Sequence, residues 1–347
     1  MQIAERPIGP QARPYLIAEM SGNHNQSLER ALEIVDAAAA AGADAIKLQT
    51  YKAETMTLDV RAPGFVIEDE KSLWNGRQLF ELYQEAHTPW DWHAPIMERA
   101  AAHGLHCFST PFDDTAVDFL ESLNVPAYKI ASFENTDLPL IRKVASTGKP
   151  MIISTGMASV AEIDEAIRTA KQAGCRDIVI LKCTSTYPAT PENTNIRTIP
   201  NMRETFGCEV GLSDHTMGCG VAVAAVALGA TVIEKHFTLA RADGGVDSAF
   251  SLEPAEFMIL RMESERAWQG LGSVTYGGTS AESKSKAFRR TLYIARDMKA
   301  GDRLDASNLR IVRPGFGLPP KYYETMLGKR INRDAAAGTP LAWELLA

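Results

Sequence analysis

The sequence has few cysteines, and none of them form a C-x-x-C pair. There are five in all, an odd number, and they lie in apolar or strand-like segments, so buried free thiols in a reducing compartment are expected. The chain also lacks a basic start followed by a long apolar core, and no later run approaches the ~18 consecutive apolar residues of a membrane span. We therefore expect a soluble, cytoplasmic protein that does not enter a membrane.

Positive charge is not in excess either. The 36 Lys and Arg residues are outnumbered by 43 Asp and Glu residues, so the formal net charge of -7 provides no bulk attraction to nucleic acid or anionic membranes. Any phosphate-binding site must be a local concentration of cationic groups, which favours a small anionic substrate. With 347 residues, 45% of them hydrophobic, the chain can form one large core and a small second one. Two domains are predicted.

Short apolar runs alternate with helical patterns over the first ~270 residues. A strand is predicted at 15–19 and a helix at 28–41, with Ser27 as its cap. Further strand-like runs lie at 45–50, 106–110, 127–132, 150–155, 178–184, 209–214 and 231–237. Eight β-then-α units predict an α/β fold of the (β/α)8 TIM-barrel type. The rival is a doubly wound open sheet, which is disfavoured because no G-x-G-x-x-G follows the first strand.

The alternation ends near residue 272, which gives a predicted barrel domain of 1–272. Residues 273–287 are rich in Gly, Ser and charge and have the composition of an interdomain linker. In the remaining segment, 288–347, the pattern R-D-x3-G-x2-L occurs at 296–304 and again at 333–341. This small module would have a marginal core of its own, so we expect it to dock against a barrel, either its own or a partner's.

Polar side chains gather where the predicted strands end, which is where TIM barrels place their reacting groups. These residues are Glu19, Lys47, Gln49, Thr110, Lys129, Ser132, Ser154, Thr184, Ser213, His215, Glu234 and His236. Because side chains alternate along a strand, Ser213 and His215 share one face, as do Glu234 and His236. Two histidines on neighbouring strands could bind one divalent cation and leave open positions for catalysis. A single strand-end histidine is more often a hydrogen-bonded structural residue, and spacing leaves both roles open.

The strand-end lysines indicate a cationic cradle. Lys47 and Lys129, together with the hydroxyls of the strand-end Ser and Thr residues, would suit a phosphate plus a carboxylate, as in phosphoenolpyruvate. Single Ser and Thr residues at strand ends more often satisfy turn backbones. Lys129 or Lys182 could instead form a Schiff base, as in metal-independent aldolases. Spacing alone does not separate these chemistries.

Several longer motifs are more specific. They are IAEMSGNHNQS (17–27), KLQTY (47–51), FSTPFD (108–113), PAYKIASFENTD (126–137), STGMAS (154–159), GLSDHTMG (211–218), EKHFTL (234–239) and ADGGVDSAFSLEP (242–254). Together they resemble the sialic acid synthase family over nearly the whole predicted barrel. The segment RRTLYIARDMKAGDRLDASNLRIVRPGFGL (289–318) resembles the antifreeze-like (SAF) domain that closes these enzymes. Within the family, AEMSGNHNQS and FENTD look like the branch that makes pseudaminic acid.

The resemblance implies a transferase that condenses phosphoenolpyruvate with an open-chain acetamido sugar. His215 and His236 would hold a divalent metal ion, Mn²⁺ or Mg²⁺, that polarises the sugar aldehyde. Residues at the family's phosphoenolpyruvate-binding positions are Lys47, Thr110, Lys129, Ser132, Ser154 and Ser213. Residues at its sugar-binding positions are Gln49, Glu134, Tyr187 and Asp247, and Thr184 stands where the neuraminate branch often has Asn. Glu134 or Glu19 would activate the attacking water, with Lys129 as a further catalytic group.

The resemblance also bears on assembly and on the sugar. Arg313 matches a family arginine that reaches from the SAF domain into the barrel of the opposite subunit, which implies a domain-swapped homodimer. Leu48 stands where the family often has a histidine, so the identity of the sugar is not fixed. A neuraminate or legionaminate synthase is the alternative to a synthase of pseudaminic acid. An acceptor with a C6 methyl group would favour an apolar patch, for which we name Phe133, Phe250 and Met20. A carbohydrate- or ice-binding protein built around the C-terminal module would leave the polar strand ends unexplained.

Overall fold

The computed structural model describes residues 1–70 and 72–347 and divides into two compact units, Met1–Gly272 and Ser273–Ala347. The first unit is a closed barrel of parallel strands in the order β10-β3-β4-β5-β6-β7-β8-β9. The strands are β3 (Tyr15–Glu19), β4 (Ala45–Thr50), β5 (His106–Pro111), β6 (Tyr128–Ile130), β7 (Met151–Ser154), β8 (Ile178–Cys183), β9 (Glu209–Asp214) and β10 (Val232–His236). Each lies within one residue or so of a predicted run, so the TIM barrel is confirmed.

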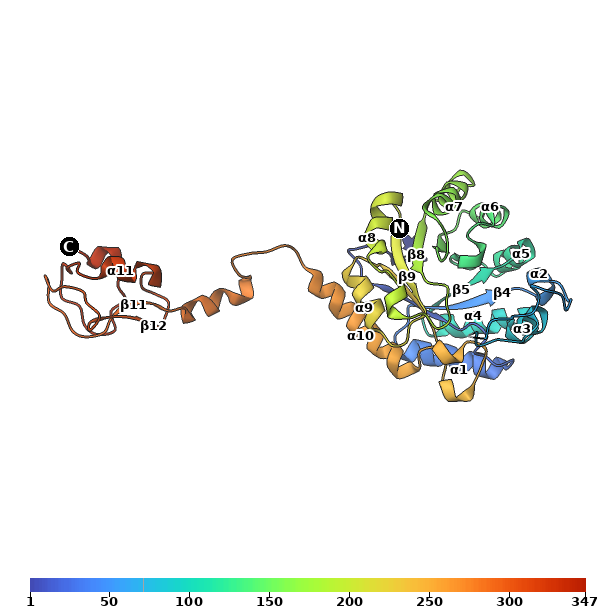
Figure 1. Ribbon diagram of the computed structural model, residues 1–347, viewed down its shortest axis with the longest axis horizontal. Helices are drawn as coiled ribbons and strands as arrows, with labels where there is room; N and C mark the ends of the chain where they lie inside the picture. The colour runs from blue at the N-terminus through green and yellow to red at the C-terminus, as the bar shows by residue number, and fades with distance from the viewer. Residues whose placement is uncertain (71) are drawn as a thin grey trace. The chain divides into compact units, whose positions relative to one another are not determined.

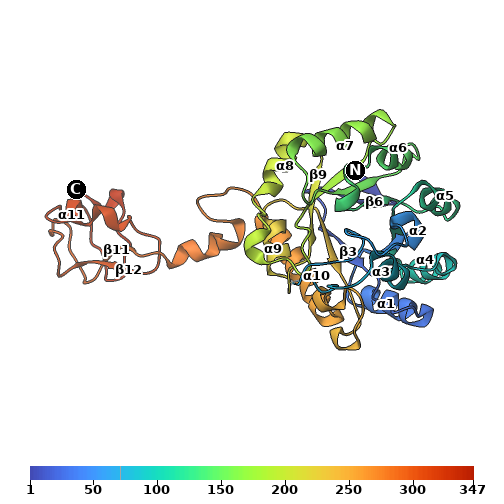
Figure 2. The same ribbon diagram turned by 45° about the vertical axis from the view of Figure 1, so that its right-hand side comes forward.

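Helices surround the strands on the outside, as Figure 1 and the turned view in Figure 2 show. They are α1 (Leu28–Ala40), α4 (His93–Ala102), α5 (Asp114–Ser122), α6 (Leu138–Ala145), α7 (Val160–Gln172), α8 (Thr198–Phe206), α9 (Gly220–Ala227) and α10 (Pro254–Leu271). The predicted cap of α1 is confirmed, because Ser27 Oγ accepts a hydrogen bond from Arg30 N at 3.2 Å. In α7, Ser159 and Glu162 form a reciprocal capping box.

The core lies between strands and helices. Its buried members are mostly Ile, Leu, Val and Ala from the strands and from the inner faces of α1, α6 and α7. This apolar layer holds the strands in one register, so the polar residues at the strand ends meet at one rim. A short hairpin of β1 (Gln2–Ile3) and β2 (Arg6–Pro7) precedes the barrel. All five cysteines are free, and across the described residues every helix is too short or too polar to cross a bilayer.

One connection is longer than the others and bears on the site. Between β4 and α4 the chain forms α2 (Ala53–Met56), α3 (Leu79–Ala86) and the single turn η1 (Trp90–Trp92). We call residues 53–92 the β4 insert. Its position after a strand places it at the carboxyl-terminal rim, where βα loops of TIM barrels form binding sites.

The second unit contains a two-stranded antiparallel sheet of β11 (Thr291–Ile294) and β12 (Leu309–Val312), with α11 (Tyr323–Met326) and the turns η7 (Pro320–Tyr322) and η8 (Trp343–Leu345). The sequence echo has a structural counterpart. Ala337 N donates to Asp297 Oδ1 at 2.8 Å, and Ala300 N donates to Asp334 Oδ1 at 2.9 Å, so each repeat closes the turn of the other. Within the predicted linker the chain is helical over η6 (Ser280–Phe288), where Thr279 and Glu282 form a capping box.

Candidate active site at the carboxyl ends of the barrel strands

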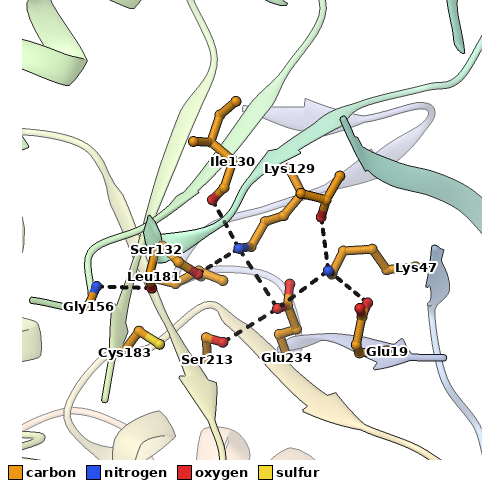
Figure 3. A network of polar contacts seen from close by, with 12 residues as sticks. Glu19, Lys47, Lys129, Ile130, Ser132, Gly156, Leu181, Cys183, Ser213 and Glu234 are labelled. Atoms are coloured by element: carbon orange, nitrogen blue, oxygen red, sulfur yellow. Dashed lines mark hydrogen bonds and ion pairs between the residues drawn. The ribbon is translucent and has the colours of Figure 1, made fainter. Parts of the chain in front are cut away.

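A buried carboxylate lies at the centre of the strand ends. Glu234 Oε1 is 3.8 Å from Lys47 Nζ and 3.9 Å from Lys129 Nζ, and Ser213 Oγ donates to it at 3.4 Å. Figure 3 shows the Glu234 carboxylate lying between the two ammonium groups. These four residues come from β10, β4, β6 and β9, so only the closed barrel brings them together.

The first strand supplies a second carboxylate. Glu19 Oε2 is 2.7 Å from Lys47 Nζ, and Gln49 Nε2 donates to Glu19 Oε1 at 2.9 Å and to Ser21 Oγ at 3.1 Å. Lys47 Nζ also donates to Thr110 Oγ1 at 3.1 Å on the neighbouring strand. Lys47 and Gln49 therefore face the same side of β4, as the alternation of side chains predicts.

The second lysine is held from the opposite side of the rim. Lys129 Nζ donates to Ser154 Oγ at 2.6 Å and to the carbonyl of Ile130 at 3.1 Å. Nearby, Ser132 Oγ accepts from Gly156 N at 3.1 Å. A Cβ on Gly156 would come within 2.7 Å of Ser132 Oγ, so the close approach of these two loops requires glycine there.

Burial and neighbouring charge set the protonation of this cluster. Burial opposes the charge on Lys47, but Glu19 and Glu234 outweigh it and raise the lysine's pKa. Burial lowers the pKa of Lys129, with partial compensation from Glu234. Burial opposes ionisation of Glu234, but Lys129 and Lys47 outweigh it and lower its pKa. Burial raises the pKa of Glu19 to about 7, so near neutrality the cluster holds two cations against Glu234 and a partly protonated Glu19.

The two strand-end histidines lie next to each other beside this cluster. The ring centroids of His215 and His236 are 5.4 Å apart. His215 Nδ1 donates to the Thr184 carbonyl at 3.0 Å, which leaves Nε2 as the nitrogen able to accept. His236 Nδ1 is buried, has no hydrogen-bond partner and lies 3.9 Å from Asp247 Oδ2.

The donor chemistry of this pair fits a divalent cation. Two adjacent imidazoles, one with an unpartnered buried nitrogen, can bind a divalent cation that completes its shell with water or substrate. Burial and the charges of His215 and Lys47 hold the pKa of His236 well below its ordinary value, which favours the neutral form that binds metals. Among the described residues, no group of three or more His, Cys, Asp and Glu side chains is arranged to hold an ion.

A cavity of about 360 Å³ opens next to the histidines. Its apolar wall comes largely from the β4 insert, and its lining includes Met56, Ile67, Trp74, Leu79, Leu82, Tyr83, Phe112, Phe133 and Tyr187. Trp74 Nε1 donates to the Val246 carbonyl at 3.0 Å, and the Trp74 ring lies 5.9 Å from that of Tyr187. These contacts tie the insert to the loops after β10 and β8. Polar groups of Ser21, Gln49, Glu134, Ser185, His236 and Asp247 complete the lining.

Glu134 is the lining carboxylate best suited to proton transfer. One of its oxygens is buried without a hydrogen-bond partner. Burial raises its pKa to about 7, against an opposing effect of Lys129. A general base works best when its pKa lies near the operating pH, so Glu134 can both accept and return a proton near neutrality.

Of the predicted residues, the ones that line the cavity are Gln49, Phe133, Glu134, Tyr187, His236 and Asp247. The charged cluster beside it contains Glu19, Lys47, Thr110, Lys129, Ser154 and Ser213. Ser132 accepts a hydrogen bond from Gly156 N, His215 adjoins His236, and Phe250 is buried against the rings of Tyr187 and His236. Three predicted residues belong to neither the cavity lining nor the charged cluster. Thr184 presents its carbonyl to His215, while its hydroxyl donates to the Asn193 carbonyl at 3.2 Å. Arg313 belongs to the second unit. The assignment of Met20 to an apolar patch was wrong, because its side chain is fully buried in the barrel core.

Sequence reasoning missed several functional features. Glu234 was placed on the same face as His236 but given no role, although it contacts both lysines. Ser21, which donates to Asp247 Oδ2 and accepts from Gln49, was not named, and neither was Trp74. The alternation Glu234-x-His236 contained the signal for Glu234. No periodic signal pointed to Trp74, since its approach to the site depends on how the β4 insert folds.

Comparison with known proteins agrees with the geometry. The NeuB family matches residues 34–276, and the SAF domain matches residues 289–347. The pseudaminic acid synthase of Campylobacter jejuni is 43% identical over 327 residues, covering 94% of this chain and 95% of that protein. The pseudaminic acid synthase of Helicobacter pylori is 41% identical, covering 95% of this chain and 96% of that protein.

A solved structure extends the likeness to three dimensions. The N-acetylneuraminic acid synthetase of Leptospira borgpetersenii superposes with a TM-score of 0.73 at 30% identity, covering 82% of this chain and 94% of that one. The family match spans more than half of the sequence and includes the strand ends that carry both lysines and both histidines. This chain therefore belongs to the NeuB family of sialic acid synthases, with a SAF domain as its second unit.

Proposed function

We propose that this protein is a pseudaminic acid synthase. It condenses phosphoenolpyruvate with 2,4-diacetamido-2,4,6-trideoxy-L-altrose and water to give pseudaminic acid and phosphate. The observation that carries this proposal is the identity of 41% and 43% to two pseudaminic acid synthases, which extends across both units of the chain. The cationic cluster, the histidine pair and the cavity support the same reaction class.

The two lysines would bind phosphoenolpyruvate. Its phosphate and carboxylate would replace the carboxylates that now contact Lys47 and Lys129, with hydroxyl donors around them. These hydroxyls belong to Thr110, Ser132, Ser154 and Ser213. Charge-assisted hydrogen bonds of this kind are about twice as strong as neutral ones, and burial strengthens them further. Partial protonation of Glu19, with its pKa of about 7, limits repulsion of the incoming anion.

His215 and His236 would hold a Mn²⁺ or Mg²⁺ ion. Such an ion would polarise the sugar aldehyde as a Lewis acid, more strongly than any side chain in the cavity could. The protein's part is to present imidazole nitrogens and to exclude bulk water. The unpartnered Nδ1 of His236 and its low pKa support this role.

We assign the proton transfer in this reaction to Glu134. C3 of phosphoenolpyruvate attacks the aldehyde carbon, water adds at C2, and the tetrahedral intermediate loses phosphate by cleavage of its C–O bond. Glu134 accepts the proton of the adding water, and Lys129 stabilises the charge that moves onto the departing phosphate. Glu19 is the alternative base, but Gln49 donates to its carboxylate, whereas one oxygen of Glu134 has no hydrogen-bond partner, which favours Glu134.

The cavity suits a sugar that is partly apolar. The C6 methyl group and the acetamido methyl groups of the proposed acceptor would contact the wall formed by the β4 insert and Phe133. Gln49, Tyr187 and Asp247 would bind its hydroxyls. A sugar with a C6 hydroxyl would place an unpaired polar group against this wall, which costs binding energy.

Two further proposals concern assembly and location. We propose a domain-swapped homodimer in which Arg313 of one copy contacts the sugar in the barrel of the other. β12 precedes Arg313 and exposes two apolar side chains, Ile311 and Val312, which could contribute to such a contact. The free thiols suit a cytoplasmic enzyme.

The test is phosphate release from phosphoenolpyruvate with Mn²⁺, with and without a chelator. The altrose derivative, its legionaminic-type isomer and N-acetylmannosamine would be compared as acceptors. Chelator-sensitive release that prefers the altrose is expected. Preference for another sugar would move the protein to a sister branch of the family, and absence of metal-dependent release with all three would overturn the synthase assignment. In a Schiff-base aldolase, borohydride would trap pyruvate as an adduct on Lys129 or Lys182. We expect no such adduct with this protein.

A further inference from the structure

A buried ion pair lies directly behind the two histidines. Lys235 Nζ is 3.0 Å from Asp214 Oδ2, and both side chains are 0% exposed. Asp214 precedes His215 and Lys235 precedes His236, and the two are paired in the ladder between β9 and β10. Because side chains alternate along a strand, the ion pair lies on the side of the sheet opposite to the histidines.

This ion pair also fixes the loop that follows β9. Besides Asp214, the Lys235 ammonium donates to the Gly218 carbonyl at 2.9 Å and to the Thr216 carbonyl. Asp214 Oδ1 in turn accepts from Thr216 N at 2.9 Å and from Thr216 Oγ1 at 2.8 Å. All three donors of the ammonium and both oxygens of the carboxylate are thus used. They tie the loop that begins with His215 to the strand that ends with His236.

Stability alone is a weak reason for such a pair. Removing two charges from water costs free energy that their attraction repays only in part, and apolar residues of similar volume often serve a core equally well. The hydrogen bonds of Asp214 and Lys235 are directional, so they can fix the geometry of the strand ends and the loop that they join. Losing a group that hydrogen-bonds a metal-binding histidine lowers metal affinity about 10- to 100-fold. Asp214 and Lys235 do not bond the histidines, but they fix the backbone that carries them and so act on the same geometry.

We propose that Asp214 and Lys235 are positioning residues that set the separation and orientation of His215 and His236, and thereby the affinity of the site for its divalent ion. This inference rests on the proposed function through the metal-binding role of the histidines. The pair does not touch the substrate. It acts through the strand register and through the loop at Thr216 and Gly218.

Mn²⁺ binding to the purified full chain, followed by the electron paramagnetic resonance signal of free Mn²⁺, tests the proposal without a turnover assay. The variants are Asp214→Asn, Lys235→Met and their combination, with circular dichroism as the check of folding. Each single variant leaves one charge buried without its partner, whereas the combination removes both. Thr216→Val is milder, because it removes one hydrogen bond to Asp214 and keeps the ion pair.

The matched control is Thr50→Val. Thr50 is also buried at the end of a strand, where its hydroxyl bonds His93 at 2.7 Å and Ser109 at 2.6 Å, but its strand carries no histidine. We expect the dissociation constant of Mn²⁺ to rise at least tenfold in the double variant and about threefold in Thr216→Val, and to stay within twofold in the control.

Two outcomes would overturn the inference. A folded double variant or Thr216→Val variant that binds Mn²⁺ as tightly as the wild-type protein would remove the positioning role and leave the proposed function intact. Absence of Mn²⁺ binding by the wild-type protein would remove the metal role of the histidines and the positioning role together.

Discussion

Replacing Glu134 by Gln should make the protein more stable above neutral pH and much less active. The pKa of Glu134 is raised from 4.5 to about 7, chiefly by burial. Because the folded-state pKa lies above the ordinary value, ionisation of this group destabilises the folded state. The cost develops as pH rises from about 4.5 to about 7 and is fully present above that. At about 1.4 kcal/mol per pKa unit, it amounts to about 3 kcal/mol.

Gln cannot ionise, so Glu134→Gln should escape this cost. Urea unfolding at pH 5 and pH 8 would measure the free energy of unfolding of both proteins. Relative to wild type, the variant should gain about 2.5 kcal/mol between these two pH values, because part of the cost is already present at pH 5. The matched control is Glu165→Gln on the exposed face of α7, whose free energy of unfolding should differ from that of wild type by less than about 0.5 kcal/mol at pH 8, as for most surface substitutions.

The same variant should lose catalysis, since a general base contributes about 100- to 10,000-fold. We expect kcat to fall by about that factor, with the KM for phosphoenolpyruvate changed less than about threefold because the lysines are intact. A variant with wild-type kcat would refute the proton-transfer role. A difference in the free energy of unfolding that does not vary with pH would show that burial does not raise the pKa of Glu134.

Three further predictions concern other parts of the chain. Lys129→Met should raise the KM for phosphoenolpyruvate about 100-fold through loss of a charge-assisted contact, and an unchanged KM would remove Lys129 from the binding site. Arg313→Ala should raise the KM for the sugar about tenfold and leave that for phosphoenolpyruvate unchanged, whereas equal effects on both would contradict a sugar contact. Ser159→Ala should lower the free energy of unfolding by about 1 kcal/mol through loss of the α7 cap, with kcat unaltered.

The barrel was predictable because local and global signals agree in it. The strand runs are apolar and short, helical periodicity follows them, and Ser27 and Ser159 mark helix starts that the structure confirms. The lysines and histidines were predictable for a related reason. Strand ends of a closed barrel converge, so residues distant in sequence, such as Lys47 and Glu234, had to lie on one rim.

The remaining features depend on contacts that periodicity does not encode. Trp74 reaches the cavity through a hydrogen bond between the β4 insert and the loop after β10, elements 172 residues apart in sequence. The error at Met20 was avoidable. Its backbone N–H continues the ladder by bonding to the Lys47 carbonyl at 3.0 Å, so its side chain alternates with that of Glu19 and lies in the core. The unpartnered oxygen of Glu134 became evident only with the fold.

The most direct test of the account is mass spectrometry of the products formed from phosphoenolpyruvate labelled with ¹⁸O in its bridging oxygen. The labelled substrate would be incubated with the diacetamido-altrose, Mn²⁺ and the wild-type protein. Condensation with C–O cleavage predicts that the label leaves in inorganic phosphate and that an unlabelled product with the mass of pseudaminic acid accumulates. Label retained in the sugar product, or release of phosphate without a nine-carbon product, would contradict it.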